Sequence, residues 1–263
     1  MTVDTLLFIF SEFLKEVQRV IAAIIDDRAS AAVRANLEAR GFSVFSLPRC
    51  ERLPEALASH PDMLMLRLGG ELFVEAGFYE ENAELFTRLT ESFPFITIRA
   101  VAQSFGNNYP KDCILNALRM GERLFVKIDT VSAEVLTAAE ALGLKLLSVK
   151  QGYPACTVLA LGETHAITAD RGMAKALSGE GIEVLLIDNG DISLPSYEYG
   201  FIGGASGVFE NKVYFLGDPK THRCGDEICR FCRAAGYEPV SLDVGILRDL
   251  GRIIFIDSEE EYQ

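Results

Sequence analysis

Two cysteines with charged neighbours are the residues of this sequence best suited to covalent chemistry. Cys113 closes the segment Pro110-Lys-Asp-Cys, and Cys156 closes the similar segment Pro154-Ala-Cys. A thiolate beside carboxylates suits attack on an amidine carbon, because a carboxylate can hold a guanidinium through two hydrogen bonds while the sulfur adds. The role requires a lowered thiol pKa, which Lys111 or Lys150 would supply. We rank Cys156 ahead of Cys113 as the catalytic candidate.

A structural role is the simpler interpretation of both thiols. Free cysteine is among the most buried residue types, and duplication would repeat a small buried residue at equivalent strand positions. The sequence favours this interpretation and keeps the nucleophile as the alternative.

Histidines and a cysteine-rich segment are weaker candidates. His60, His165 and His222 have no partner at a diagnostic spacing, so we interpret each as structural. The spacing Cys224-x4-Cys229-x2-Cys232 resembles an iron–sulfur pattern, but Asp226–Ala235 is read as a helical run whose apolar stripe includes Cys232. We expect no metal and no other cofactor.

Similar blocks recur along the chain and must position these residues. Pro61, Pro110, Pro154 and Gly204 open the blocks and lie 49, 44 and 50 residues apart. Each block is read as strand, strand, helix and strand, and the predicted units span 61–98, 112–149, 155–187 and 204–242. Aspartates after the second strands are expected to cap the helices that follow; they are Asp26, Asp129, Asp170 and Asp218.

The two ends of the chain complete a fifth unit. Residues 20–47 are read as strand, helix and strand, and residues 251–257 are read as a strand with no helix after it. We therefore expect 251–257 to pair into the N-terminal unit, which would protect both strand edges. Residues 20–263 are predicted to form a single domain, and 1–19 a helical extension.

Charge and hydropathy narrow the classes of partner. The net charge is −13 and the chain has no run of basic residues, which argues against nucleic acid and anionic membranes. The opening stretch lacks a basic segment before its short apolar run, so we expect a cytoplasmic protein with reduced thiols. The helical extension has one apolar face, which would dock on the body or form a homodimer with a second copy.

Five such units around a pseudo-fivefold axis resemble the pentein fold of guanidino-group-modifying enzymes. The segment Gly203-Gly-Ala-Ser-Gly-Val-Phe, continued to Val244-Gly-Ile-Leu, is similar to the Gly-Gly-Asp block of dimethylarginine hydrolases and to their Leu-His-Leu segment. The strand beginning Pro61-Asp is similar to their Pro-Asp strand. Arginine deiminases, amidinotransferases and the non-catalytic ribosome anti-association factors share the fold. The whole chain looks like an uncharacterised bacterial family of this fold, which implies a five-bladed α/β propeller.

Departures from the hydrolase pattern fall at its functional positions. Arg67-Leu68 stands where the hydrolases have Glu-Asp, and Gly204-Ala205 stands where they end Gly-Gly-Asp. Leu247 replaces the general-base histidine, and no cysteine lies near the last strand. The usual Cys-His-acid set is therefore not evident in its usual places.

The resemblance implies that the first strands of the units line a central channel and bring their opening residues to one mouth. The candidate ligand-binding residues are Asp62, Asp112, Asn116, Gln151, Ser206, Arg248 and Asp249. We expect a small polar or cationic ligand of the guanidino or amidino type. If the protein is an enzyme, it would be a hydrolase or amidinotransferase acting on C–N bonds. The alternative is a non-catalytic protein-interaction scaffold.

Overall fold

The computed structural model describes residues 19–259 and shows a mixed α/β fold. Within these residues the strands form five three-stranded sheets and one two-stranded ladder. The middle strand of each three-stranded sheet pairs antiparallel with one neighbour and parallel with the other. One local pattern is thus used five times.

Four of the sheets are built from consecutive segments. Their strands are β3 (Met65–Leu68), β4 (Glu71–Glu75) and β5 (Thr97–Val101); β6 (Ala117–Met120), β7 (Arg123–Val126) and β8 (Lys145–Ser148); β9 (Val158–Leu161), β10 (His165–Thr168) and β11 (Glu183–Leu186); and β13 (Ser206–Phe209), β14 (Lys212–Phe215) and β15 (Glu238–Ser241). The two-stranded ladder joins β12 (Ile192–Ser193) to β16 (Leu247–Arg248) in parallel.

The fifth sheet joins the two ends of the chain. Its central strand β1 (Ile21–Asp26) pairs in parallel with β2 (Phe42–Leu47) and antiparallel with β17 (Ile254–Asp257). Ile21 lies opposite Asp257, and Ile24 lies opposite Ile254. The expected pairing of the C-terminal strand with the N-terminal unit is therefore present.

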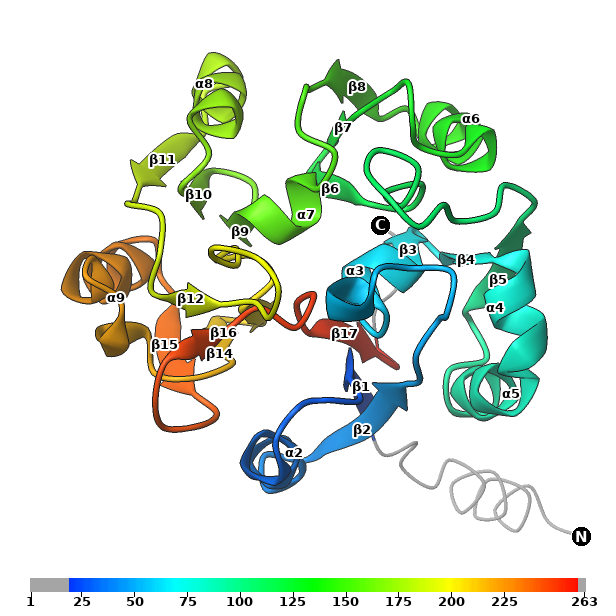
Figure 1. The fold of residues 1–263 in the computed structure, drawn as a ribbon, viewed down its shortest axis with the longest axis horizontal. Coiled ribbons are helices and arrows are strands. Elements are labelled where there is room, and N and C mark those ends of the chain that lie inside the picture. The colour runs from blue at the N-terminus through cyan, green and yellow to red at the C-terminus, as the bar shows by residue number, and fades with distance from the viewer. Residues whose placement is uncertain (1–18, 260–263) are drawn as a thin grey trace, which may run out of the picture.

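Helices connect the second and third strands of each sheet and cover its outer side. They are α2 (Ala31–Glu38), α4 (Ala76–Glu81) with α5 (Ala83–Ser92), α6 (Ala133–Ala141), α8 (Arg171–Gly179), and α9 (Gly225–Ala234) after the short turn η2 (Pro219–Thr221). Residues four positions apart provide the buried stripe, as Val33 and Leu37 do in α2 and as Met173 and Leu177 do in α8. In Figure 1, α2, α5, α6, α8 and α9 lie around the periphery of the view.

The helix caps differ in part from the sequence prediction. Asp170 caps α8 by accepting from the Met173 amide, and Asp218 accepts from the Lys220 amide at η2. The prediction is wrong for Asp26 and Asp129, because Ser30 and Ser132 stand nearer the start of α2 and α6 and supply the capping oxygen. Asp26 is thereby left for another role.

Two short helical turns precede β3 and β9, where the sequence analysis expected strand. These are α3 (Pro61–Leu64) and α7 (Pro154–Thr157), and a further turn, η1 (Glu55–Leu57), lies before α3. Proline at the first helical position has a backbone angle already suited to a helix and lacks an N–H that would be unpaired there. Figure 1 shows α3 and α7 near the middle of the view. Asp62 and Cys156 are therefore carried on helical turns close to the centre.

The predicted N-terminal helix, and with it the predicted dimer contact, lie outside the described residues. No helix within 19–259 has the length and apolarity required to cross a membrane.

Candidate functional site

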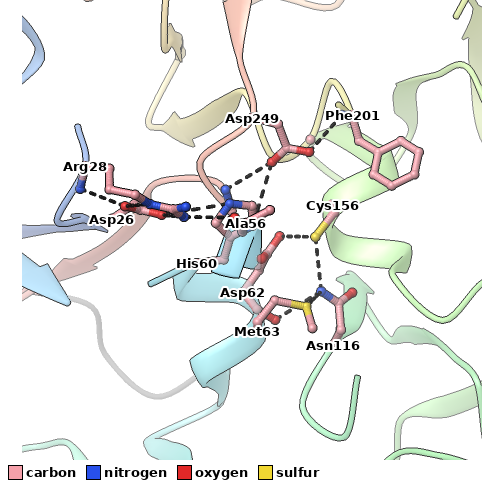
Figure 2. A network of polar contacts seen from close by, with 12 residues as sticks. Asp26, Arg28, Ala56, His60, Asp62, Met63, Asn116, Cys156, Phe201 and Asp249 are labelled. Carbon is pink, nitrogen blue, oxygen red and sulfur yellow. Dashed lines mark hydrogen bonds and ion pairs between the residues drawn. The ribbon is translucent and has the colours of Figure 1, made fainter. Parts of the chain in front are cut away.

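Two of the predicted site residues meet directly, although they are far apart in sequence. The Cys156 thiol, on α7, donates a hydrogen bond to Oδ2 of Asp62, on α3, with 2.8 Å between sulfur and oxygen. Both side chains are 3% exposed. Figure 2 shows this contact within a network of polar side chains. The structure thus places a thiol and a carboxylate in proton-transfer contact inside the fold.

Asn116 fixes the two turns relative to each other. Its side-chain amide donates to the backbone carbonyl of Asp62 at 3.1 Å and to the sulfur of Cys156 at 3.3 Å. Its carbonyl oxygen accepts from the backbone N–H of Ala155 at 2.9 Å. A fully buried amide is stable only when its hydrogen bonds are made, and here they join α3, α7 and the start of β6.

Asp249 is a second buried carboxylate in the cluster, held by backbone amides. It accepts from the N–H of Phe201 at 2.8 Å and from that of Gly251 at 3.1 Å. A Cβ at position 204 would lie 2.5 Å from Cγ of Asp249. The glycine that the sequence compares with the hydrolase block is therefore required for the Asp249 carboxylate to pack there.

His60 lies between two carboxylates and is fully buried. Its Nε2 is 3.8 Å from Oδ2 of Asp26, and its Nδ1 is 3.9 Å from Oδ1 of Asp249. Neither nitrogen has a hydrogen-bond partner among the described residues. Asp26 itself is paired with Arg28, whose Nε donates to it at 2.9 Å. No described histidine is hydrogen-bonded to Cys156 or Cys113.

Arg252 is a lone cation beside the cluster. Its backbone N–H donates to the carbonyl of Gly204 at 2.8 Å, and its φ of 59° is in the left-handed region that non-glycine residues rarely adopt. The partly buried guanidinium makes no hydrogen bond or ion pair with any described residue. Burial lowers the pKa of Arg252, while the negative charge of Asp62 acts to raise it.

Burial shifts the protonation of the whole cluster. It raises the pKa of Asp62 to about 6, and burial together with the charge of Asp62 raises the pKa of Asp249 to about 7. Burial and both carboxylates raise the pKa of the Cys156 thiol well above its usual value. Burial lowers the pKa of His60 to about 3. At neutral pH the thiol is protonated and the imidazole is neutral.

The second predicted cysteine belongs to a different group. Cys113 donates to the carbonyl of Pro110 at 3.0 Å, and burial raises its pKa to about 11. Its neighbour Asp112 accepts from the Tyr153 hydroxyl at 2.7 Å, while Oδ1 of Asp112 is buried without a partner. No hydrogen bond in the described part of the chain joins this group to Asp62 or Cys156.

The remaining predicted ligands lie apart from the cluster contacts. Gln151 donates to Asp170 at 2.8 Å and lines a pocket of about 570 Å³ that also contains Tyr109 and Lys150. Ser206 is buried and donates to the carbonyl of Ile202 at 2.8 Å. Arg248 is exposed on β16.

Three members of the cluster were missed as site residues. The sequence pattern indicates a structural role for His60 and mainly a capping role for Asp26, and it gives no signal for Arg252. A histidine directly before Pro61-Asp62 was the available signal for His60. Among residues 19–259, the cysteines of α9 included, no group of three or more His, Cys, Asp or Glu side chains is arranged to hold a metal ion.

The fold that carries this cluster is similar to that of the pentein, guanidino-modifying enzymes. A structure of a dimethylarginine dimethylaminohydrolase adduct has a TM-score of 0.51 and 12% identity, covering 85% of this chain and 92% of that chain. An amidinotransferase from Microseira wollei, in saxitoxin biosynthesis, has a TM-score of 0.54 and 11% identity, covering 88% and 79%. An arginine dihydrolase of the cyanobacterial ornithine–ammonia cycle has a TM-score of 0.50 and 12% identity, covering 92% and 40%. At these identities the likeness shows the fold alone.

The chain belongs to the family of unknown function DUF6873, whose model matches residues 24–254. The comparison with curated proteins finds no match.

Proposed function

We propose that this protein binds a small cationic ligand of the guanidino or amidino class at the cluster of Asp62, Asn116, Cys156 and Asp249. The observation that carries the proposal is a pair of buried carboxylates, Asp62 and Asp249, that have no lysine or arginine within 4.0 Å among the described residues. A planar cation with several N–H donors complements two such acceptors. Its charge would also lower the pKa of both carboxyl groups and stabilise their ionised forms.

The Cys156 thiol supports a reaction as well as binding. Sulfur held 2.8 Å from a carboxylate beside the bound cation would be placed to add to the amidine carbon. The activity we propose is therefore hydrolysis, or transfer to an amine, at a C–N bond of the ligand. On this proposal the five sheets are the blades of a pseudo-fivefold propeller, with β17 completing the first blade.

Thermal shift with matched ligands tests the binding proposal. Arginine, agmatine and creatine carry a guanidinium, whereas citrulline carries a neutral urea of the same shape. Near 100 times Kd, a ligand adds about 2.7 kcal/mol of stability, which raises the melting temperature of a chain this size by several degrees. We expect such a shift with at least one guanidino compound, none with citrulline, and its loss in Asp249→Asn.

Asp112→Asn is the matched control, because Asp112 is buried but contacts Tyr153 rather than Cys156. It should keep the ligand-induced shift. If no guanidino or amidino compound shifts the melting temperature of the wild-type protein, the proposed function is wrong and the interaction scaffold becomes the better account.

A further inference from the structure

The direct partner of the Cys156 thiol is a carboxylate. The thiol donates to Oδ2 of Asp62. The one histidine of the network, His60, instead faces Asp26 and Asp249. Among the described residues no imidazole is hydrogen-bonded to the sulfur, and the acceptor for the thiol proton is Asp62.

The geometry of Asp62 is suited to receiving that proton. Asn116 ties the Asp62 backbone carbonyl and the Cys156 sulfur to one amide group, so α3 and α7 cannot slide apart without breaking at least one of these bonds. The other carboxylate oxygen, Oδ1, is buried and has no hydrogen-bond partner among residues 19–259. One oxygen can thus accept from the thiol while the other remains available to a ligand.

We propose that Asp62 is the catalytic proton acceptor and donor for Cys156, in the place where a histidine would be expected. The inference rests on the proposed function, because it concerns thiol chemistry on a bound amidine cation. The proposed Asp62–Cys156 pair differs from a cysteine–histidine pair, because its base is negatively charged before the reaction and neutral during attack.

The first half of the proposed reaction forms a covalent adduct on Cys156. The thiol proton moves to Asp62 as the sulfur electron pair forms an S–C bond with the guanidinium carbon, giving a neutral tetrahedral adduct beside a neutral carboxylic acid. The leaving nitrogen then takes the Asp62 proton as its C–N bond breaks, which leaves a cationic amidino-thioether on Cys156 and an ionised Asp62. Water in a hydrolase, or an acceptor amine in a transferase, then gives a proton to Asp62 as it attacks the same carbon, and the sulfur takes that proton back from Asp62 as its C–S bond breaks. In the hydrolase the remaining proton of the cationic adduct goes to the released amine, which leaves a neutral urea.

If Asp62 only suppressed ionisation of the Cys156 thiol, replacing it would have the opposite effect on the reactivity of the sulfur. The charge of Asp62 raises the thiol pKa, so a carboxylate that only represses ionisation would release a more reactive sulfur when neutralised. A carboxylate that accepts the proton would leave a slower sulfur when it is replaced. Asp62→Asn keeps the shape of the side chain and separates the two cases.

The test measures alkylation of Cys156 by mass spectrometry in the full chain, using 2-chloroacetamide and its cationic isostere 2-chloroacetamidine. The neutral reagent decides the question, because it does not depend on attraction to a carboxylate. We expect Asp62→Asn to slow its reaction at pH 7.5 by about tenfold or more, within the range of general-base effects. Asp112→Asn should react like the wild type, and Cys156→Ser sets the background. An Asp62→Asn protein that reacts as fast or faster overturns the proposal.

A second measurement needs no variant and protects the test against misfolding of Asp62→Asn. If Asp62 accepts the proton, the wild-type rate with the neutral reagent rises as Asp62 ionises near pH 6 and then levels off. A rate that stays flat through pH 6 and rises only above pH 9 contradicts the proposal. Either result is separate from the thermal-shift test, which concerns ligand binding alone.

Discussion

Gly204 and Asp249 lie so close together that no side chain fits at position 204. A Cβ there would lie 2.5 Å from the carboxyl carbon of Asp249, which is itself held by the amides of Phe201 and Gly251. Asp249 cannot retreat without losing those two hydrogen bonds. The packing of one glycine therefore determines where a buried carboxylate sits.

Gly204→Ala should destabilise the protein by about 1–3 kcal/mol, the usual cost of overpacking a well-packed interior. Gly179→Ala is the control, because Gly179 is in α8 with open space around it, and it should be neutral or slightly stabilising. Urea unfolding of the two variants checks the prediction. Equal midpoints for both variants would contradict the close contact.

The pKa of Asp249 predicts how stability changes with pH. An aspartate titrates near 3.9 in the unfolded chain and near 7 here, so the folded state holds more protons between these values. This contribution to stability is present at low pH and is lost as pH rises from about 4 to about 7. Asp249→Asn should remove it, and the melting temperature of the variant should fall less than that of the wild type between pH 5 and 8. An unchanged slope would show that Asp249 is already ionised in the folded state.

His60 should change the stability of the protein with pH in the opposite direction to Asp249. Its pKa is lowered to about 3 from an unfolded value near 6.5, so the unfolded chain binds the extra proton. The protein therefore loses stability as pH falls below about 6.5. His60→Gln should therefore gain stability relative to the wild type between pH 6.5 and pH 4. Melting curves over that range, referenced to pH 7.5, measure the difference, and a constant offset between the two proteins would contradict it.

Truncating Arg28 and truncating Arg252 should have different effects on the free energy of unfolding. Arg28 pairs with the fully buried Asp26, so Arg28→Ala leaves the carboxylate with the backbone N–H of residue 28 but without its cationic partner, and should cost roughly 3 kcal/mol. Arg252 has no polar partner for its guanidinium among residues 19–259, and its left-handed backbone is easier for glycine. Arg252→Gly should therefore cost little or stabilise. Chemical denaturation compares the pair, and a larger loss for Arg252→Gly would indicate that its guanidinium is bound.

Removal of β17 should unfold the protein. Ending the chain after residue 250 takes away four residue pairs with β1 and exposes the edge of a central strand. Ending it after residue 259 removes only residues beyond β17 and serves as the control. A cooperative melt near the intact value for the shorter chain would show that β17 is dispensable to the fold.

Local patterns predicted most of the elements. The units predicted over 112–149 and 155–187 each contain the expected helix, α6 and α8, and the glycines after their last turns, Gly143 and Gly181, adopt the positive φ that ends a helix. The sequence did not predict the turns α3 and α7. Four residues are too few to show a period, so Pro61 and Pro154 were read as openings of strands.

The sequence by itself determined the repeated order of strands and helices, apart from the turns α3 and α7, and that the last strand should join the first unit, because these depend on patterns within a few residues and on one repeated unit. It also identified Asp62, Asn116, Cys156 and Asp249 as candidates. Only the tertiary structure decided that Asp62 and Cys156, 94 residues apart, are hydrogen-bonded, that Cys113 does not join them, and that His60 faces two carboxylates. Such contacts depend on how separate sheets are placed around the centre, and no local pattern records that placement.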